Sequence, residues 1–424
     1  MESLLIWIGI VIVIATIVLL IKGVETRVTL LASGFLMAFI SLNPLAAFNA
    51  FSSRMVFGGL IEPILSVMGF AYVMKLTKCD AHLINLLAKG LSKVQLLLIP
   101  GACLVTAFIN VSLASAAGVS AAVGSILIPM LIASGVRPAL AAAAVFGGTF
   151  GSAISPGNAH NVFIATKLVN LPVMDVINVM FWPTVISVVI GAAGLTIVGF
   201  VTKENRGWKP EQSSVTEIGH ANPFLAIIPI LPIALLMLIS SSVGAEYPEL
   251  KKIRISHAML LGVFIGIAAT RTSPTTAVRE FFRGTGDVYA TVFGIIISAA
   301  VFVGGMNAIG LTDAFNEMLK TSGDAARWAA AFGPFVLAVI MGSGDAATLA
   351  FNEAVSPHAM QYGMTVMNMS CLANIAGAIG RTMSPLTGAV IVCSGIAGVP
   401  TMDIAKRTAP GMLVAIVVVA FWFA

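Results

Sequence analysis

The stretches GSAISPGNAHN at 151–161 and GRTMSPLTG at 380–388 are the most informative part of this sequence. Each places a Ser-Pro pair inside a long apolar run, and in each a glycine stands four residues before the serine. Proline removes a backbone donor and disfavours the helical conformation at the residue before it. Both stretches therefore predict a membrane helix that is broken near its middle. The alternative is a proline kink that only shapes packing.

Further landmarks accompany the two Ser-Pro pairs at the same spacing. Downstream, Pro172-Val-Met-Asp matches Pro400-Thr-Met-Asp, and upstream a proline followed six residues later by glycine occurs at Pro129 and at Pro357. All three landmarks have the same order in both halves, with an offset of 228 or 229 residues. The chain is therefore predicted to be an internal repeat.

The composition is that of a membrane protein. The chain has 424 residues, of which 58% are hydrophobic and only 10% are charged, whereas soluble domains carry about 25% charged residues. The apolar residues form several runs close to the length of about 20 residues that crosses a bilayer. We therefore predict an all-α polytopic membrane protein embedded in a lipid bilayer.

Several functional classes find no support in the sequence. The four cysteines show no CxxC spacing and are expected to be core residues, and the five histidines form no HExxH motif. There is no phosphate-binding loop and no nucleophile elbow, so we predict no metal site, no cofactor and no enzyme activity. The net charge of +5 is explained by basic loops on the inner side of a membrane, so no nucleic-acid partner is implied.

The repeat divides the chain into four parts. Residues 1–26 are predicted to hold an extra N-terminal membrane helix, 27–201 the first repeat, 202–255 polar linkers with a connecting membrane helix, and 256–424 the second repeat. Each repeat also contains an apolar region whose two arms are too short to cross a bilayer easily, which predicts a re-entrant hairpin. The predicted hairpins lie at about 95–134 and 329–362, and the predicted spans lie at 4–21, 27–43, 59–76, 138–170, 181–201, 223–243, 256–270, 286–309, 365–397 and 408–424.

The order of these spans predicts that the two repeats are inverted. Five crossings separate the start of the second span from the start of the seventh, so the second repeat enters the membrane from the opposite face. With the N-terminus outside, 15 Lys and Arg residues fall on the inner face and 7 on the outer face, as the positive-inside rule requires. The polar segments 78–93 and 311–328 are expected to lie along the membrane surface.

A broken helix exposes helix ends that attract charged ligands. Free N–H groups attract anions, and free carbonyl groups attract cations. The second break also carries Arg381, and an arginine at membrane depth costs at least about 2.5 kcal/mol, so it is usually paired or functional. Its guanidinium can hold a carboxylate through two parallel hydrogen bonds. The alternative is a structural ion pair with Asp345, Asp313 or Glu353.

The hairpins contribute small and hydroxyl-bearing residues that allow a ligand to approach the backbone. The first hairpin carries Asn110, Ser112 and Ser115, and the second carries Gly-Ser-Gly-Asp at 342–345. Asp345 is a candidate to bind a cation, to take a proton or to pair with the arginine of the second break. His160, just after the first break, is a candidate proton carrier or a polar residue of a cavity wall.

These segments resemble the DcuC family of anaerobic four-carbon dicarboxylate carriers, within the ion transporter superfamily. The similar stretches are GSGDAATLAF at 342–351, GRTMSPLTGAVIV at 380–392, AKRTAP at 405–410, SLASAAG at 112–118, MGFAYVM at 68–74 and FFRGTGDVYA at 281–290. The resemblance covers nearly the whole chain. It implies an inverted-repeat, elevator-type carrier of the cytoplasmic membrane, commonly a homodimer, that moves succinate, fumarate, malate or related dicarboxylates.

For such a carrier we expect Arg381 and the helix N-termini at the breaks to hold the carboxylates, with Na+ or H+ as the coupling ion. Both hairpins and both broken spans would slide against the remaining helices. The coupling-ion candidates are Asp345, Asn110 and His160, and the other expected substrate contacts are Ser112, Ser115, Ser155, Gly157, Asn158, Ser343, Gly344, Thr382, Ser384 and Thr387. The alternatives are a sodium/proton or other anion antiporter of the same superfamily, an anion channel and, with least support, a membrane-embedded enzyme.

Overall fold

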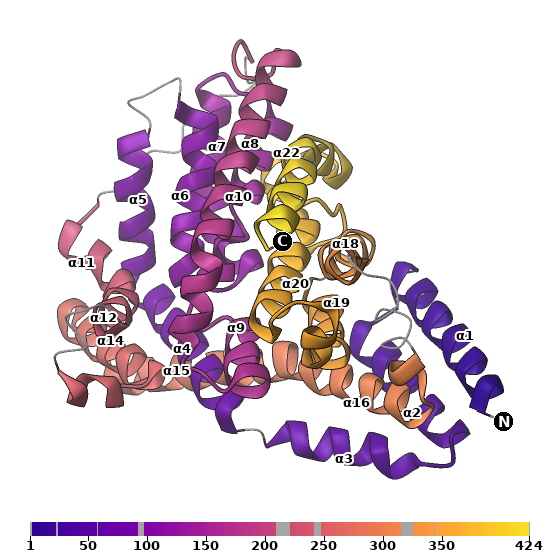
Figure 1. Ribbon diagram of the computed structural model, residues 1–424. Helices are drawn as coiled ribbons and strands as arrows, with labels where there is room; N and C mark the ends of the chain where they lie inside the picture. The colour runs from indigo at the N-terminus through magenta and orange to yellow at the C-terminus, as the bar shows by residue number, and fades with distance from the viewer. Residues whose placement is uncertain are drawn as a thin grey trace.

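The computed structural model describes residues 2–22, 24–56, 58–91, 97–208, 221–240, 247–314, 325–342 and 344–423 (Figure 1). Its helices are α1 (Glu2–Ile21), α2 (Thr26–Ile40), α3 (Pro44–Met55), α4 (Gly58–Leu76), α5 (Cys79–Leu91), α6 (Leu98–Ser112), α7 (Ala116–Ala133), α8 (Pro138–Gly147), η2 (Gly151–Ile154), α9 (Ala159–Phe163), η3 (Ile164–Val169), α10 (Val173–Val201), α11 (Pro223–Ile227), η4 (Ile228–Ile230), α12 (Leu231–Ser240), η5 (Pro248–Lys252), α14 (Ile255–Thr270), α15 (Pro274–Val288), η6 (Tyr289–Phe293), α16 (Gly294–Ala308), α18 (Ala325–Met341), α19 (Gly344–Ala354), η7 (Ser356–Tyr362), α20 (Val366–Arg381), α21 (Gly388–Ala397) and α22 (Thr401–Trp422). The described ranges contain no strand, so the predicted all-helical class is confirmed there.

Apolar helices of membrane-spanning length account for much of the fold. Within the described residues, five helical stretches are long and apolar enough to cross a membrane: Ala116–Ala133, Pro138–Val169, Val173–Val201, Pro274–Ala308 and Thr401–Trp422. Shorter apolar helices, among them Thr26–Ile40 and Ile255–Thr270, accompany them. Large apolar side chains such as Trp7, Trp182 and Phe264 are exposed on the outside of the molecule. A surface of this kind suits lipid contact.

Two helices lie where no span was predicted. Both α3 and α15 begin with a proline at the first helical position, where its fixed φ favours the helix and its missing N–H has no helical partner to lose. Neither is a continuous apolar run, because α3 contains Arg54 and α15 contains Arg279 and Arg283. The predicted span at 286–309 covers the last three residues of α15, the π-helical turn η6 and all of α16.

Each predicted hairpin region contains two packed helices joined by a short link. In the first, α6 and α7 are joined by Leu113–Ser115, and in the second, α18 ends at Met341 and α19 begins at Gly344. The polar segment predicted at 78–93 contains α5, whereas residues 315–324 of the other polar segment lie outside the described part. So do residues 209–220 and 241–246 of the linkers.

Both breaks occur at the Ser-Pro pairs. The first helix stops at the end of α8, passes through the 3-10 turn η2 and resumes at α9. Ser155 is extended at φ −80° and ψ 133°, the conformation expected for a residue before proline. The second helix stops at the end of α20 and resumes at α21. The inverted relation of the two repeats stays a prediction.

The repeated glycine of the two motifs is required by close packing. A Cβ atom on Gly151 would lie 2.1 Å from the carbonyl oxygen of Ala107 on α6. A Cβ on Gly380 would lie 2.3 Å from the carbonyl oxygen of Phe335 on α18. In both halves the broken helix therefore touches the backbone of the first hairpin arm at the equivalent glycine. This direct contact, rather than a left-handed backbone conformation, is what excludes a side chain there.

The repeated Pro-x-Met-Asp element starts the helix that follows each break. Pro172 and Pro400 are the N-cap residues of α10 and α22, and Asp175 and Asp403 lie in their first turns. An acidic residue there interacts favourably with the helix dipole. Both helices therefore begin earlier than the predicted starts at 181 and 408, because an Asp in the first turn strengthens a helix although it interrupts an apolar run.

Helices of the two halves pack against one another. α6, α7, α8 and α10 lie side by side (Figure 1), and from the second half α21 packs on α7 while α22 packs on α10 and α8. The second-half helix α20 packs on α18 and also touches α10. Elsewhere α16 packs against α2 and α3, and α4 packs against α14 and α15. The hairpin tips and the breaks meet between these groups.

Candidate substrate site

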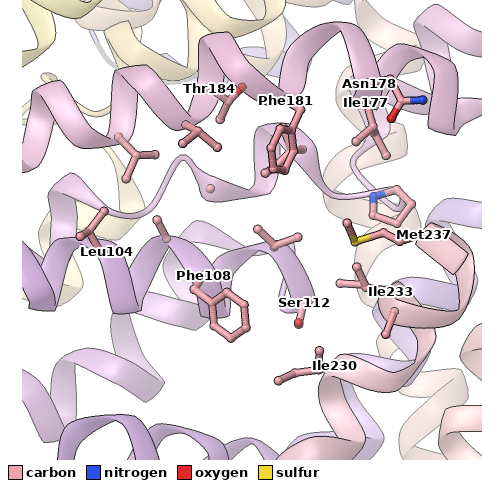
Figure 2. Close-up of a pocket in the computed structure, with 18 of the residues that line it drawn as sticks. Leu104, Phe108, Ser112, Ile177, Asn178, Phe181, Thr184, Ile230, Ile233 and Met237 are labelled. Atoms are coloured by element: carbon pink, nitrogen blue, oxygen red, sulfur yellow. The ribbon is translucent and has the colours of Figure 1, made fainter. Parts of the chain in front are cut away.

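The larger of the two main cavities is apolar and lacks the chemistry of an anion site. Its volume is about 640 Å³, and its walls come from α6, α10 and the η4–α12 segment (Figure 2). Phe108, Phe181 and Met237 are typical of its lining, and Asn178 and Thr184 are among its few polar residues. Because no charged side chain lines it, it offers nothing to balance the charge of a carboxylate.

A second cavity, the central cavity, lies where both hairpin tips and both breaks meet. It has a volume of about 420 Å³. Ser115 comes from the first hairpin and Asn158 from the first break, whereas Asp345 comes from the second hairpin and Arg381 from the second break. The remaining wall is formed by α4 and by the α15–η6 segment. Elements far apart in the sequence therefore converge on one polar space.

Four helices begin at the wall of the central cavity. Their first residues are Ala116 of α7, Ala159 of α9, Gly344 of α19 and Gly388 of α21, and all four line the cavity. Each helix N-terminus carries free N–H groups and about half a positive charge. The arrangement provides, without any charged side chain, a region that favours an anion.

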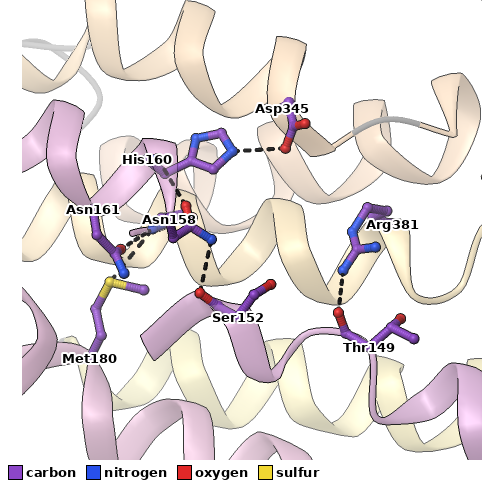
Figure 3. Close-up of polar contacts among 9 residues, drawn as sticks. Thr149, Ser152, Asn158, His160, Asn161, Met180, Asp345 and Arg381 are labelled. Carbon is purple, nitrogen blue, oxygen red and sulfur yellow. Dashed lines mark hydrogen bonds and ion pairs between the residues drawn. The ribbon is translucent and has the colours of Figure 1, made fainter. Parts of the chain in front are cut away.

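His160 and Asp345 join the two halves across the central cavity. The imidazole Nε2 lies 2.9 Å from Asp345 Oδ1 (Figure 3). The other ring nitrogen, Nδ1, is buried and has no hydrogen-bond partner among the described residues. His160 is only 7% exposed, whereas the Asp345 side chain is 46% accessible beside the cavity that both residues line. The pair is therefore a titratable contact at the wall of the candidate site.

Arg381 reaches across to the first break without using a carboxylate. Its Nη2 donates a hydrogen bond to the carbonyl oxygen of Thr149 at 2.8 Å (Figure 3). Within the described residues it forms no ion pair: Asp345 pairs with His160, and Glu353 pairs with Arg54. A guanidinium has five N–H donors, so donors remain for a ligand in the cavity.

The asparagines of the first half satisfy the open backbone of the first break. Asn110 Oδ1 accepts from the Ser152 N–H at 2.8 Å, and Asn158 Nδ2 donates to the Ser152 carbonyl at 2.9 Å. Asn161 Nδ2 donates to the carbonyl oxygens of Ala153 and Ser155 at 2.6 and 2.9 Å. Buried backbone groups need such partners, so these amides keep the break irregular and stable.

Asn374 extends this network into the second half, because its Nδ2 donates to Asn161 Oδ1 at 2.9 Å. The sequence alone did not single out Asn374, since an asparagine inside an apolar helix has no local signature of its partner. Asn110, which was predicted to bind a coupling ion, has both ends of its amide occupied, because its Nδ2 donates to the Leu113 carbonyl.

The predicted substrate contacts divide into two groups. Ser115, Gly157, Asn158, Gly344, Arg381 and Thr387 line the central cavity. Ser115 and Thr387 also cap α7 and α21, because their side-chain oxygens accept from the N–H groups of Gly118 and Val390.

The others are placed elsewhere. Ser112 lines the apolar cavity, and Ser155, Thr382 and Ser384 are buried outside the central cavity lining. Thr382 Oγ1 donates to the Ala378 carbonyl, and Ser384 Oγ accepts from the Leu386 N–H. Ser343 lies outside the described residues. The periodicity of a helix does not reveal its rotation about its own axis, so these orientations were not predictable.

Asp287 is a cavity residue that the sequence analysis missed. It lines the central cavity from α15, and Tyr72 of α4 donates its hydroxyl proton to Asp287 Oδ2 at 3.0 Å. It belongs to the stretch 281–290 that was quoted for the family resemblance. No break or repeat marked it.

The charged side chains of the central cavity do not by themselves favour a dianion. They are the guanidinium of Arg381 and the carboxylates of Asp345 and Asp287, so their net charge is −1 when His160 is neutral. The four helix N-termini offset part of this charge. A ligand with two carboxylates would therefore bind more favourably together with a proton or a cation.

A metal site would need several His, Cys, Asp or Glu side chains close together within the described residues. No group of three or more His, Cys, Asp or Glu residues is positioned to hold a metal ion there. Cys79, Cys103, Cys371 and Cys393 are free and buried, which confirms that they are core residues.

Comparisons with known proteins point to one transporter family. The model of the DcuC family, described as C4-dicarboxylate anaerobic carrier, matches residues 47–423. A Haemophilus influenzae protein described as an uncharacterized transporter is 41% identical over 279 residues, which cover 63% of this chain and 99% of that protein. The anaerobic C4-dicarboxylate transporter DcuC of Escherichia coli (strain K12) is 25% identical over 373 residues, or 85% of this chain and 80% of that protein.

Solved structures show that the fold is that of a membrane transporter. MtrF of Neisseria gonorrhoeae, from a study of a class of antimetabolite efflux pumps, is similar with a TM-score of 0.64. The similarity covers 89% of this chain and 83% of MtrF at 14% sequence identity. At this identity the likeness concerns architecture alone, and substrate choice has to be argued from the site.

Proposed function

This chain belongs to the DcuC family of anaerobic C4-dicarboxylate carriers, and on that basis we propose that its central cavity binds a four-carbon dicarboxylate and carries it across the cytoplasmic membrane. The observation that carries the proposal is the convergence of Arg381 and four helix N-termini on one cavity. A dicarboxylate such as succinate, fumarate or malate has two charges that hydrocarbon does not accept. Fixed positive groups that surround the anion replace the water it loses.

The two carboxylates are assigned to different groups. Arg381 holds one of them through its free N–H donors, as a bidentate pair. The other lies against the N–H groups at the starts of α7, α9, α19 and α21. Ser115 and Thr387 add polar contacts at two of these starts, whereas the amide of Asn158 bonds the Ser152 carbonyl and the His160 N–H and holds the start of α9 in place. Gly157 and Gly344 let the helix starts pack closely, because an added Cβ would lie 2.1 Å from Val67 and 2.8 Å from the Gly377 carbonyl oxygen. Ser343 stays a candidate of the second hairpin tip.

The coupling ion acts at the His160–Asp345 pair. The net side-chain charge of the cavity is negative with a neutral imidazole, so entry of a dianion calls for a proton on this pair or for Na+ beside its carboxylate. The contact of 2.9 Å makes the two groups one site for a positive charge. Asn110 is not assigned to this role, because its amide already bonds the backbone.

The movement that exposes the cavity to either side is of the elevator type. Both hairpins and both broken helices form the mobile body, and the remaining helices form the scaffold. The packing of α20 on α18 and of α21 on α7 supports this division, because it joins the second broken helix to both hairpins. In the same way α8 of the first broken helix packs on α6 and α7 of the first hairpin. The carrier works as a homodimer with its N-terminus outside.

Uptake by proteoliposomes tests the proposal. The purified full-length protein is reconstituted, and initial uptake of radiolabelled succinate is compared with that of fumarate, malate, acetate and glutamate under imposed Na+ or pH gradients. We expect saturable uptake of four-carbon dicarboxylates that one of the two gradients accelerates. Uptake that does not saturate would indicate a channel.

A second measurement separates the carrier from a cation antiporter. The same vesicles are loaded with a pH-sensitive dye and receive a Na+ pulse without any dicarboxylate. A rapid pH change under these conditions, together with no uptake of any dicarboxylate, would contradict the proposal. Movement of protons only when succinate is present would support it.

A further inference from the structure

A third cavity lies outside the central one and carries an unbalanced positive charge. Its volume is about 300 Å³, and its walls come from α3, η3, α16 and α19. Arg54, Lys167 and Glu353 line it together with the side-chain amide of Asn307. Two cations and one carboxylate leave a net charge of +1. The large apolar cavity, in contrast, is lined by no charged side chain.

Arg54 and Glu353 form the buried part of this site. The guanidinium Nη2 bonds Glu353 Oε1, and the charged end of Arg54 also lies over the ring of Phe163 with its Cζ atom 5.4 Å from the centroid. Arg54 is 6% exposed. The pair links α3 to α19 across α16, which packs against both helices.

Lys167 supplies the charge that Glu353 does not balance. It lies on η3, it is exposed, and it forms no ion pair within the described part of the chain. Asn307 of α16 brings an amide to the same space. One water molecule needs a cavity volume of only about 10–15 Å³. The third cavity, with about 300 Å³, therefore has room for a small hydrated anion.

The third cavity and the central cavity are lined by residues of the same two elements. On α19, Asp345 lines the central cavity and Glu353 lines the third, and on the α9–η3 segment His160 and Lys167 do the same. The members of each pair are seven or eight residues apart, which corresponds to about 10–12 Å along a helix. The two cavities therefore lie at opposite ends of the same two neighbouring segments.

We propose that the third cavity is a peripheral binding site for a small carboxylate anion, held by Lys167 and Arg54 on its way to or from the central cavity. The identity of the anion rests on the proposed function of the central cavity, whereas the existence of the site rests on its own charge and volume. Charge-assisted hydrogen bonds to a carboxylate satisfy Lys167 and leave the Arg54–Glu353 pair in place.

Equilibrium binding of radiolabelled succinate to full-length protein in phosphatidylcholine nanodiscs tests the site. Arg381→Ala removes the central site and is expected to retain a weaker binding component that acetate displaces. Adding Lys167→Gln to Arg381→Ala is expected to weaken this component about tenfold, the effect of losing one hydrogen bond to a charged group. Lys167 is chosen because it is exposed, whereas a substitution of Arg54 would leave Glu353 buried without its partner.

Lys406→Gln in the Arg381→Ala background is the matched control. Lys406 is also an exposed lysine, and it lies on α22 away from the described cavities, so this variant should retain the weaker component unchanged. If the Lys167 and Lys406 variants lose the weaker binding component to the same extent, the effect comes from the overall charge of the protein. That result would overturn the proposed site.

Two further outcomes overturn the proposal. The first is that the wild type binds succinate and Arg381→Ala binds none. This result would show that no peripheral site exists, and it would leave the proposed function intact. The second is loss of the weaker component when phosphatidylglycerol is added at constant ionic strength, which assigns the cavity to a lipid headgroup. A wild type that neither binds nor transports succinate contradicts the proposed function instead.

Discussion

The two broken helices share a sequence pattern but are stabilised by different side chains. In the first, 11 residues (148–158) separate α8 from α9, and asparagine amides bond the open backbone. In the second, only six residues (382–387) separate α20 from α21, and the hydroxyls of Thr382, Ser384 and Thr387 are sufficient. A longer open segment exposes more backbone groups, so it needs side chains that both donate and accept over a longer reach.

This difference leaves the two breaks with different contributions to the site. In the first break, the asparagine amides bond the open backbone of the break itself. The first break contributes His160 and the start of α9 to the central cavity. The second break needs little internal support and presents Arg381, whose counterpart in the first repeat is Ser152. The arginine of the site therefore comes from the second half only, although both halves supply helix N-termini.

The largest effect is expected from removing the charge of the second break. Arg381→Ala should lower the initial rate of succinate uptake at least about 100-fold, because two charge-assisted hydrogen bonds to the carboxylate are lost. Arg381→Lys should lower it about tenfold, since an ammonium keeps the charge but not the fork. Uptake in proteoliposomes measures both, and circular dichroism checks that the variants are folded. Parental rates in both variants would show that this arginine does not grip the carboxylate.

The next effect tests what the two breaks have in common. Gly151→Ala and Gly380→Ala should each destabilise the protein by about 3 kcal/mol, because each new Cβ would meet a carbonyl oxygen at 2.1 or 2.3 Å. Thermal unfolding in detergent measures the loss. Gly395→Ala is the control, since nothing lies within 4 Å of its Cβ position on α21, and it should be neutral or slightly stabilising. A harmless substitution at either motif glycine would mean that the packing is not equivalent.

A smaller effect separates the first break from the second. Asn161→Ala should destabilise the protein by about 2 kcal/mol, because two backbone carbonyls lose their donor. Asn374→Ala removes one side-chain bond to the same residue and should cost about 1 kcal/mol. The double variant should lose less than the sum of the two, as expected for residues in one network. If the stability losses of the two single variants add up exactly in the double variant, Asn374 does not support the first break through Asn161.

The smallest effect concerns the contact between the two halves just beyond the C-terminal end of α10. Glu204, which follows α10, accepts hydrogen bonds from Arg407 Nε and Nη2 of α22 at 2.6 and 2.5 Å. These bonds hold the pKa of Glu204 below its usual value of 4.5. A carboxyl with a lowered pKa in the folded state contributes stability at neutral pH and loses it as the pH falls below 4.5 toward the lowered value.

The melting temperature should therefore fall on acidification by a few degrees more in the wild type than in Glu204→Gln. Asp403→Asn is a useful control, because the Asp403 backbone carbonyl, and not its side chain, accepts from Arg407. Identical acid profiles in the wild type and Glu204→Gln would show that this ion pair does not contribute to the pH dependence.

Much of the fold followed from local properties of the chain. The helices break at the Ser-Pro pairs that contain Pro156 and Pro385, whereas Pro63, Pro129 and Pro183 lie inside continuous helices. Proline therefore favours a break, and the neighbouring glycines make the irregular backbone possible. Runs of apolar residues require a bilayer or a protein core. Both breaks and the two packed helix pairs at 95–134 and 329–362 were predicted for this reason.

The expectation that every hairpin arm is too short to cross a bilayer was wrong for α7, which is long and apolar enough to do so. The sequence did not predict α3 and α15 as separate helices, because their polar residues interrupt any apolar run.

Which residues line the central cavity depends on contacts between helices, and no local sequence pattern encodes these contacts. Four of the ten expected substrate contacts other than Arg381 lie outside the central cavity, because the rotation of a helix about its axis is decided by packing. Asp287 entered the cavity only through the placement of α15 against α4.

The sequence by itself determined the membrane class, the helical content and the two Gly-x-x-x-Ser-Pro elements at which a helix stops, since composition, apolar length and a short motif act locally. The tertiary structure decided which charges meet. His160 touches Asp345, Arg381 reaches the carbonyl of Thr149, and Arg54 pairs with Glu353, over separations of 185 to 299 residues. Such pairs form because burial forces each polar group to find a partner, and only the packed helices determine which partner is within reach.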